Sequence, residues 1–184
     1  MGNQNGVSQM IDIEKLPYNF LQRLAYSFCA GDMLTVIIRD DGEMIWDWGG
    51  SWTVSGPDRE QTVRLINNLN GWRQGIGKDY LIYGRMLKPL PVEGMHDVPM
   101  ITRTTGLIIP FESLFTSNWL LDDGRKSQFL VNYLPVKQSV SIDFSDYRDI
   151  RIHTAPDHAV GNTANVGKIE IEIEPLSAVM VSYR

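Results

Sequence analysis

The sequence predicts an α+β protein in which an N-terminal α/β segment precedes an antiparallel β-sandwich of Greek-key type. In residues 1–80, apolar residues at helical spacing alternate with short strand-like runs. From residue 81 onward, many short strands follow one another with turn signals between them, which is typical of a β-sandwich. We therefore predict a segment of residues 1–80 and a domain of residues 81–184, with the boundary within residues 78–95.

Two helices are predicted in the first segment. The first starts near Pro17 and ends at Gly31, and the second follows Pro57, with Asp58 as its N-cap, and ends near Gly75. Apolar residues three and four positions apart give each helix one apolar face. The predicted faces are Leu16, Phe20, Leu21, Leu24 and Phe28 in the first helix, and Val63, Ile66, Leu69 and Trp72 in the second.

Between these helices lies the run "MLTVIIRDDGEMIWDW", which predicts a hairpin turning at Asp40-Asp41-Gly42. Its first strand, Met33 to Ile38, is apolar at consecutive positions, as expected of a strand buried on both faces. After the second helix, "DYLIYGRML" predicts a strand that leads into the sandwich.

The predicted strands of the second domain are short and regularly spaced. They are 100–103, 114–121, 127–134, 139–144, 149–153, 168–174 and 178–183. In "KIEIEIE" the isoleucines and glutamates alternate, which indicates a half-buried antiparallel strand. The stretch "SNWLLDDGRKSQFLVNY" predicts a hairpin turning at residues 122–124, with Trp119 facing Tyr133 across it and with Asn118 and Asn132 bonded to turn or edge backbone groups.

Composition excludes several classes of protein. The chain has 184 residues, is 43% hydrophobic and 21% charged, and carries a net charge of −5 with no basic block, so a nucleic-acid surface is not expected. No apolar run approaches the roughly 20 residues of a membrane span. The first 20 residues lack the pattern of a secretory signal, which leaves the compartment open. The composition is that of a soluble globular protein.

The order of the strands resembles the C-terminal β-sandwich domain that follows the catalytic barrel in many bacterial glycoside hydrolases. The resemblance is carried by "SNWLLDDG", by the return strand "FLVNY", and by "IEIEIEPLSAVMVSY" with its Pro-Leu-Ser turn. Upstream, residues 16–49 and "KDYLIYGRML" resemble the last βα units of such a barrel and its exit into the sandwich. A whole (β/α)₈ barrel needs roughly 200 residues or more, so the resemblance implies that this chain carries only the end of one.

Candidate catalytic residues are Glu43 and Asp47, because glycoside hydrolysis requires two carboxyl groups about 5 Å or more apart. The simpler interpretation is that Asp40, Asp41 and Glu43 are turn and flanking residues of the hairpin. "WDWGGSW" places Trp46, Trp48 and Trp52 close to Asp47. Such rings can form a platform for the apolar faces of sugars, or can instead pack in the core.

No cofactor or metal site is expected. His153, Asp157 and His158 lie in "HTAPDH", where Pro156 breaks any helix and the residues read as solvated loop positions. Cys29, the single cysteine, lies beside the apolar face of the first helix and is predicted to be a core residue.

The resemblance implies that the sandwich supports a catalytic barrel and edges a sugar site, with the isolated chain inactive. The alternative is a free-standing, non-catalytic module that binds a carbohydrate or a protein. Because barrel units without their neighbours expose apolar surface, we expect the chain alone to self-associate through residues 15–55. Residues 95–184 alone are expected to stay monomeric.

Overall fold

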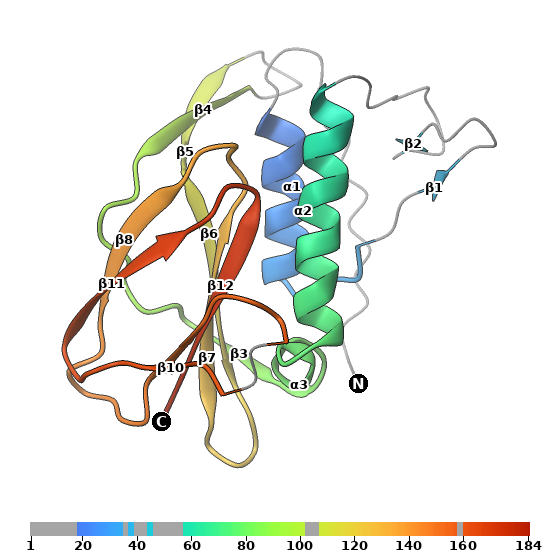
Figure 1. Ribbon diagram of the computed structural model, residues 1–184. Helices are drawn as coiled ribbons and strands as arrows, with labels where there is room; N and C mark the ends of the chain where they lie inside the picture. The colour runs from blue at the N-terminus through green and yellow to red at the C-terminus, as the bar shows by residue number, and fades with distance from the viewer. Residues whose placement is uncertain (1–17, 35–36, 39–43, 46–56, 102–106, 158–159) are drawn as a thin grey trace.

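The protein is mostly antiparallel sheet with a few helices (Figure 1). A computed structural model describes residues 18–34, 37–38, 44–45, 57–101, 107–157 and 160–184. In the described part of the chain, a six-stranded sheet forms the centre, helices cover one of its faces, and a two-stranded ribbon covers the other.

The central sheet has the strand order β10-β9-β12-β7-β6-β3, and all of its pairs are antiparallel. Its longest strands, β6, β7 and β12, lie side by side, with the short strand β3 on one side of them and the short strands β9 and β10 on the other. The strands are β3 (Arg85–Leu87), β6 (Leu114–Leu120), β7 (Lys126–Asn132), β9 (Arg151–His153), β10 (Asn162–Thr163) and β12 (Ser177–Tyr183).

Helices α1 (Tyr18–Cys29) and α2 (Pro57–Gln74) lie side by side on one face of the sheet and run in the same direction (Figure 1). The short helix α3 (Lys78–Tyr83) follows at their lower end and leads into β3. Pro57 occupies the first helical position of α2, where its missing amide hydrogen leaves no bond unmade.

Three two-stranded units complete the described structure. The ribbon of β8 (Gln138–Asp143) and β11 (Lys168–Ile173) covers the second face of the sheet, and an arm of β4 (Asp97–Ile101) and β5 (Ile108–Glu112) lies beside the upper part of α1. The strands β1 (Ile37–Ile38) and β2 (Met44–Ile45) pair with each other beyond the helices (Figure 1).

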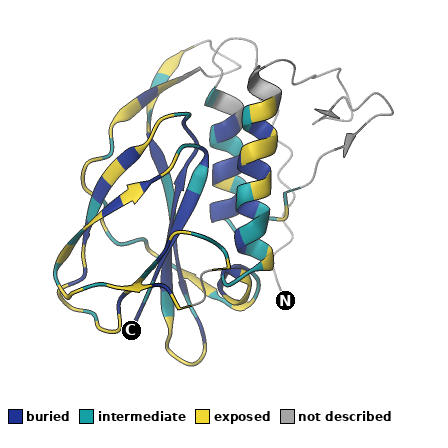
Figure 2. Ribbon diagram, viewed as in Figure 1, coloured by how far each residue is buried: buried dark blue, intermediate teal, exposed yellow. Residues whose placement is uncertain are grey.

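The two faces of the sheet bury separate apolar clusters (Figure 2). Along β7, Phe129 and Val131 belong to the helix-side cluster, whereas Leu130 between them belongs to the ribbon-side cluster. This alternation follows from the pleat of a strand, which points successive side chains to opposite faces. Burial on both faces explains why residues 129–131, "FLV", are apolar at consecutive positions.

The strand predictions for the second domain are largely confirmed. The alternation of 168–174 is observed, with Ile171 and Ile173 buried and the glutamates exposed. The hairpin turns where predicted, and Gly124 adopts the left-handed region at φ +84°. The pairing of Trp119 with Tyr133 is wrong: Trp119 pairs with Ser127, and Tyr133 lies beyond the last pair of the ladder.

Both predicted helices exist, with differences in detail. Leu21, Leu24 and Phe28 of α1 are buried, as predicted; Leu16 and the side chain of Phe20 lie outside the described residues. In α2 the buried face centres on Leu65, and Val63 is 38% exposed.

Two further predictions differ from the structure. Asp58 lies inside the first turn of α2 rather than at its cap. The strand predicted for "DYLIYGRML" is wrong in its first half, because residues 78–83 form helix α3 and only residues 85–87 are β-strand.

Candidate functional site

The segment that carries the predicted catalytic and sugar-contacting residues leaves the C-terminal end of α1. There the amide of Asp32 donates to the carbonyl of Ser27 at 2.9 Å, and the amide of Gly31 donates to that of Phe28 at 2.9 Å. With Gly31 in the left-handed region at φ +80°, these two bonds form a Schellman motif. The predicted stop of α1 at Gly31 is confirmed.

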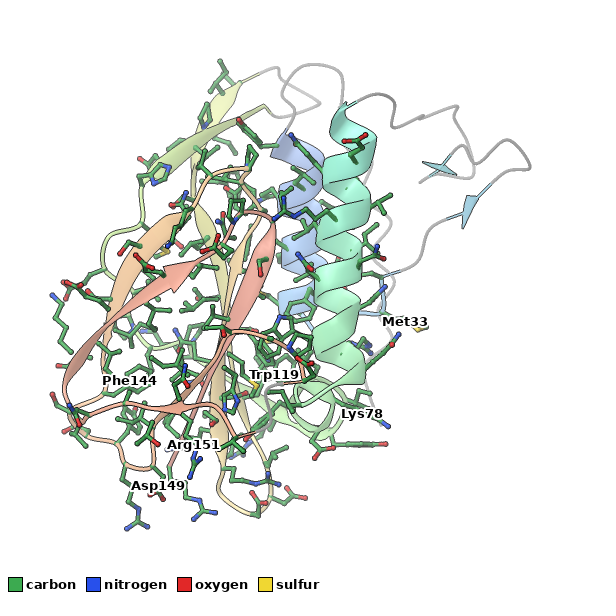
Figure 3. The ribbon with its side chains drawn as sticks, in the orientation of Figure 1. Met33, Lys78, Trp119, Phe144, Asp149 and Arg151 are labelled. Carbon is green, nitrogen blue, oxygen red and sulfur yellow. The ribbon has the colours of Figure 1, made fainter. Side chains whose placement is uncertain are left out.

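Trp119 of β6 packs beneath this helix end (Figure 3). A Cβ atom added at Gly31 would lie 3.0 Å from Cη2 of the indole and 3.2 Å from the carbonyl oxygen of Leu81 in α3. The indole nitrogen donates to Oγ of Ser117 at 2.9 Å. Sheet, α1 and α3 therefore meet around one buried ring, which fixes where the chain leaves α1.

The last turn of α2 is hydrogen-bonded to the C-terminal end of α1. Nη1 of Arg73 donates to the carbonyl oxygen of Gly31 at 2.7 Å and to that of Asp32 at 3.3 Å. The C-terminal ends of both helices therefore lie together, which agrees with their parallel course. A guanidinium group also suits the negative end of a helix dipole. Burial raises the pKa of the Asp32 carboxyl, and the positive charges of Arg73 and Arg23 oppose that rise.

Between this point and Pro57, the structure describes residues 32–34 and the β1–β2 pair. Ile37 pairs with Ile45 and Ile38 with Met44, so the predicted antiparallel pairing across residues 40–42 is observed. The predicted start of its first strand is wrong, because Met33 lies outside any strand and is 61% exposed. The predicted site residues all lie outside the described residues. They are Glu43 and Asp47 as catalytic candidates, and Trp46, Asp47, Trp48 and Trp52 as sugar contacts.

A second set of contacts fixes the connection from the helices to the arm. The side-chain amide of Gln128 accepts from the amide of Leu90 at 2.7 Å and donates to the carbonyl of the same residue at 3.0 Å. Nδ2 of Asn118 donates to the carbonyl of Lys88 at 3.2 Å, and its Oδ1 accepts from the Tyr183 hydroxyl at 2.8 Å. Residues 88–90 are thus held against β6 and β7 by buried side chains.

The predicted role of Asn132 is also confirmed. Its Nδ2 donates to the carbonyl oxygens of Val136 at 2.7 Å and Glu174 at 3.1 Å, and its Oδ1 accepts from the amide of Leu134 at 3.0 Å. This fully buried amide therefore closes the turns that follow β7 and β11.

The prediction that the residues of the histidine-containing loop are solvated is wrong for His153, which is buried at the end of β9. The ring of His153 is buried, and Nε2 lies 2.9 Å from Oγ of Ser182; Asp157 is exposed, and His158 lies outside the described residues. The carbonyl of Pro156 accepts from the amide of Ile76 at 3.1 Å, which attaches the loop to the end of α2. Within the described ranges, no group of three or more His, Cys, Asp or Glu side chains is placed to hold a metal ion.

Cys29 is a core residue, as predicted. It is 5% exposed, and burial raises the pKa of its thiol to about 12, an effect only partly opposed by a hydrogen bond with Ser117. A thiol with this pKa is protonated at neutral pH and is a poor nucleophile.

Sequence patterns did not indicate the roles of Arg73, Trp119 and Gln128. Each acts on a residue at least 38 positions away, and no local spacing encodes such a contact. The signal for Gln128 was present in weak form: a glutamine between apolar residues of a doubly buried strand must find a hydrogen-bond partner.

The described helices α1, α2 and α3 and the helix side of the central sheet bury one common apolar cluster. Both ends of segment 30–57 are attached to helices that share one core with the sheet. Comparison with models of protein families gives no match, and no curated protein sequence matches the chain. In the described part, no helix is both long and apolar enough to cross a membrane.

Proposed function

We propose that this chain is the C-terminal portion of a glycoside-hydrolase-like protein, in which the sheet supports a catalytic barrel and edges a sugar site. In this proposal, α1, the segment that follows it and α2 are the last units of the barrel. The β8–β11 ribbon is the second layer of a Greek-key sandwich.

The observation that carries the proposal is the parallel course of α1 and α2. Two consecutive helices that run side by side in one direction require a connection that runs back along them. In a barrel of alternating strands and helices, the strand between two helices makes that return. Here the connection starts at the C-terminal end of α1 and contains β1, which lies in the apolar run Met33 to Ile38 and pairs antiparallel with β2.

The rigid attachment of the helices supports a role as scaffold. Phe129 of β7 packs edge-to-face against Phe28 of α1, with ring centroids 5.5 Å apart, and against Trp72 of α2 at 6.1 Å. A site held by such a frame keeps its side chains in place, which catalysis and sugar binding both require.

The proposal is tested by the complete reading frame that encodes this chain and by its product. We expect an upstream, in-frame barrel with a carboxylate pair. The whole polypeptide should hydrolyse aryl glycosides or polysaccharides, whereas the 184-residue chain should not.

A deletion variant tests whether residues 81–184 support the catalytic part of the protein. Removing residues 81–184 from the complete polypeptide should abolish its folding or activity. A reading frame that encodes the chain alone, with sugar binding but no turnover, would favour the free-standing binding module instead. Turnover by the isolated chain that is lost in Glu43→Gln or Asp47→Asn would place the reaction in this segment.

A further inference from the structure

The outer face of the β4–β5 arm is exposed and largely apolar. Residues directly opposite in an antiparallel pair share a face, and in the arm Pro99 lies opposite Pro110 and Asp97 opposite Glu112. All four are exposed, and Ile108 on the same face is 67% exposed. This face is called the arm surface below.

The inner face of the arm holds it in place. Val98 is 5% exposed, and Ile109 and Phe111 pack against the helix-side cluster. At its base, the hydroxyl of Tyr133 donates to the carbonyl of Glu112 at 2.7 Å, and the amide of Ser113 donates to the carbonyl of His96 at 2.8 Å. The arm surface is therefore a fixed surface rather than the side of a loose loop.

Pro99 and Pro110 determine how a partner can approach. Proline has no amide hydrogen, so neither strand offers a donor at its central position, and strand addition along either edge is disfavoured. A partner must instead lie on the face of the arm.

The charges on the arm surface indicate the chemistry of that partner. Like charges directly opposite each other destabilise a strand pair, yet Asp97 and Glu112 occupy such positions. Among the described residues, neither carboxylate belongs to an ion pair. A partner that is apolar at its centre and carries a lysine or arginine at its margin complements this surface.

The size of the arm surface argues against a second copy of the chain. Two five-residue strands present a face of roughly 160 Å², from a rise of about 3.4 Å per residue and a strand spacing of about 4.8 Å. A stable complex between separate molecules buries about 800 Å² on each partner. A contact this small is suited to another part of the same polypeptide, because the linkage supplies a high effective concentration.

The arm lies beside the upper part of α1, at the end of the molecule where α1 and α2 begin (Figure 1). In a (β/α)₈ barrel the loops that lead into helix N-termini surround the active site. Resting on the proposed function, we infer that the arm surface docks on the βα loops of the catalytic barrel, against an apolar patch with a basic residue at its margin. The arm would then form part of the rim of the substrate site.

Hydroxyl-radical labelling tests this inference on the product of the complete reading frame and on the 184-residue chain. Labelling of Ile108 and Pro110 should fall several-fold in the complete product. Val136, which is 53% exposed in the turn after β7, should be labelled equally in both. In the complete product, Ile108→Asp should restore the labelling of Pro110, whereas the matched control Val136→Asp should leave it low.

Three outcomes can be told apart. A complete reading frame that encodes no barrel would contradict the proposed function, and with it the arm inference. A barrel that is present while Ile108 stays fully labelled overturns the arm inference alone. Protection of Ile108 only at high protein concentration would mean that a second copy covers the arm surface, which also overturns the inference.

Discussion

The two faces of the central sheet are covered in different ways. On the ribbon side, β8 and β11 bury aliphatic side chains that recur at every second position, such as Ile171 and Ile173. On the helix side, large rings fit against glycines: Gly31 lies against Trp119, and Gly77 lies against Phe129. The ribbon side therefore depends on a repeating pattern, whereas the helix side depends on individual long-range fits.

Removing the helices should have the largest effect. Without α1 and α2, residues 95–184 would expose Phe129, Val131 and Met180, which the helices cover. The structure thus changes the expectation that this piece stays monomeric. We expect it to bind hydrophobic dyes and aggregate, as measured by fluorescence and light scattering. A monodisperse, dye-free piece would show that the ribbon side alone makes a stable domain.

Truncation of single core side chains should have the second-largest effect on stability. Phe129→Ala should lower the free energy of unfolding by about 3–5 kcal/mol, and Leu130→Ala on the opposite face by about 2–5 kcal/mol, measured by urea denaturation. Because Phe129 contacts Trp72, Phe129→Ala and Trp72→Ala should combine non-additively.

The matched pair is Leu130→Ala with Trp72→Ala, whose effects should add within about 0.5 kcal/mol because the two side chains lie in different clusters. Equal coupling in both pairs would mean that the two faces are not independent.

A smaller effect is expected from adding one methyl group on the helix side. A Cβ atom at Gly77 would lie 2.7 Å from the carbonyl oxygen of Trp72 and 2.9 Å from Cζ of Phe129, so Gly77→Ala should destabilise by about 1–3 kcal/mol. Gly124→Ala is the control: it has open space within 4 Å and should cost only the strain of its positive φ. If Gly77→Ala lowers the melting temperature by no more than Gly124→Ala does, the packing of Phe129 against residue 77 adjusts to an added methyl group at little cost.

Alkaline pH should lower the free energy of unfolding by a modest amount, through buried tyrosines on both faces of the sheet. Burial raises the pKa of the Tyr133 phenol on the helix side and of the Tyr183 phenol on the ribbon side above the ordinary value of 10.0. The folded state therefore favours the neutral phenols. Their contribution is complete below the unfolded pKa and is lost as the pH rises through about 10 and beyond. The urea midpoint should fall between about pH 9 and pH 11.

The double variant Tyr133→Phe, Tyr183→Phe should flatten this decline. A midpoint that falls as steeply in the double variant would assign the pH dependence to other groups.

The same difference between the faces explains what could be predicted from the sequence. A period of two residues and an Asp-Gly turn are local signals, so the strands of the ribbon side and the hairpin of β6 and β7 were found. Helix α3 was missed because the short apolar run around Tyr80 and Leu81 fits a strand as well as a helix. In the structure the Leu81 carbonyl lies against Gly31, a long-range contact that no local pattern reveals.

Of the residues singled out from the sequence, some can be compared with the structure and others cannot. Asn118 and Asn132 were identified correctly because buried amides in strands must satisfy backbone groups. The roles of Glu43, Asp47 and the tryptophans stay predictions, since they concern residues outside the described ranges.

Hydrogen exchange on the 184-residue chain tests the central claim, that helices and sheet form one rigid support. The amides of α1 and α2 are predicted to open with the same free energy as those of β7 and β12, because all four elements share the helix-side cluster. Helices that exchange at much lower free energy than the sheet would contradict the account and would identify the β-sheet as an independent unit.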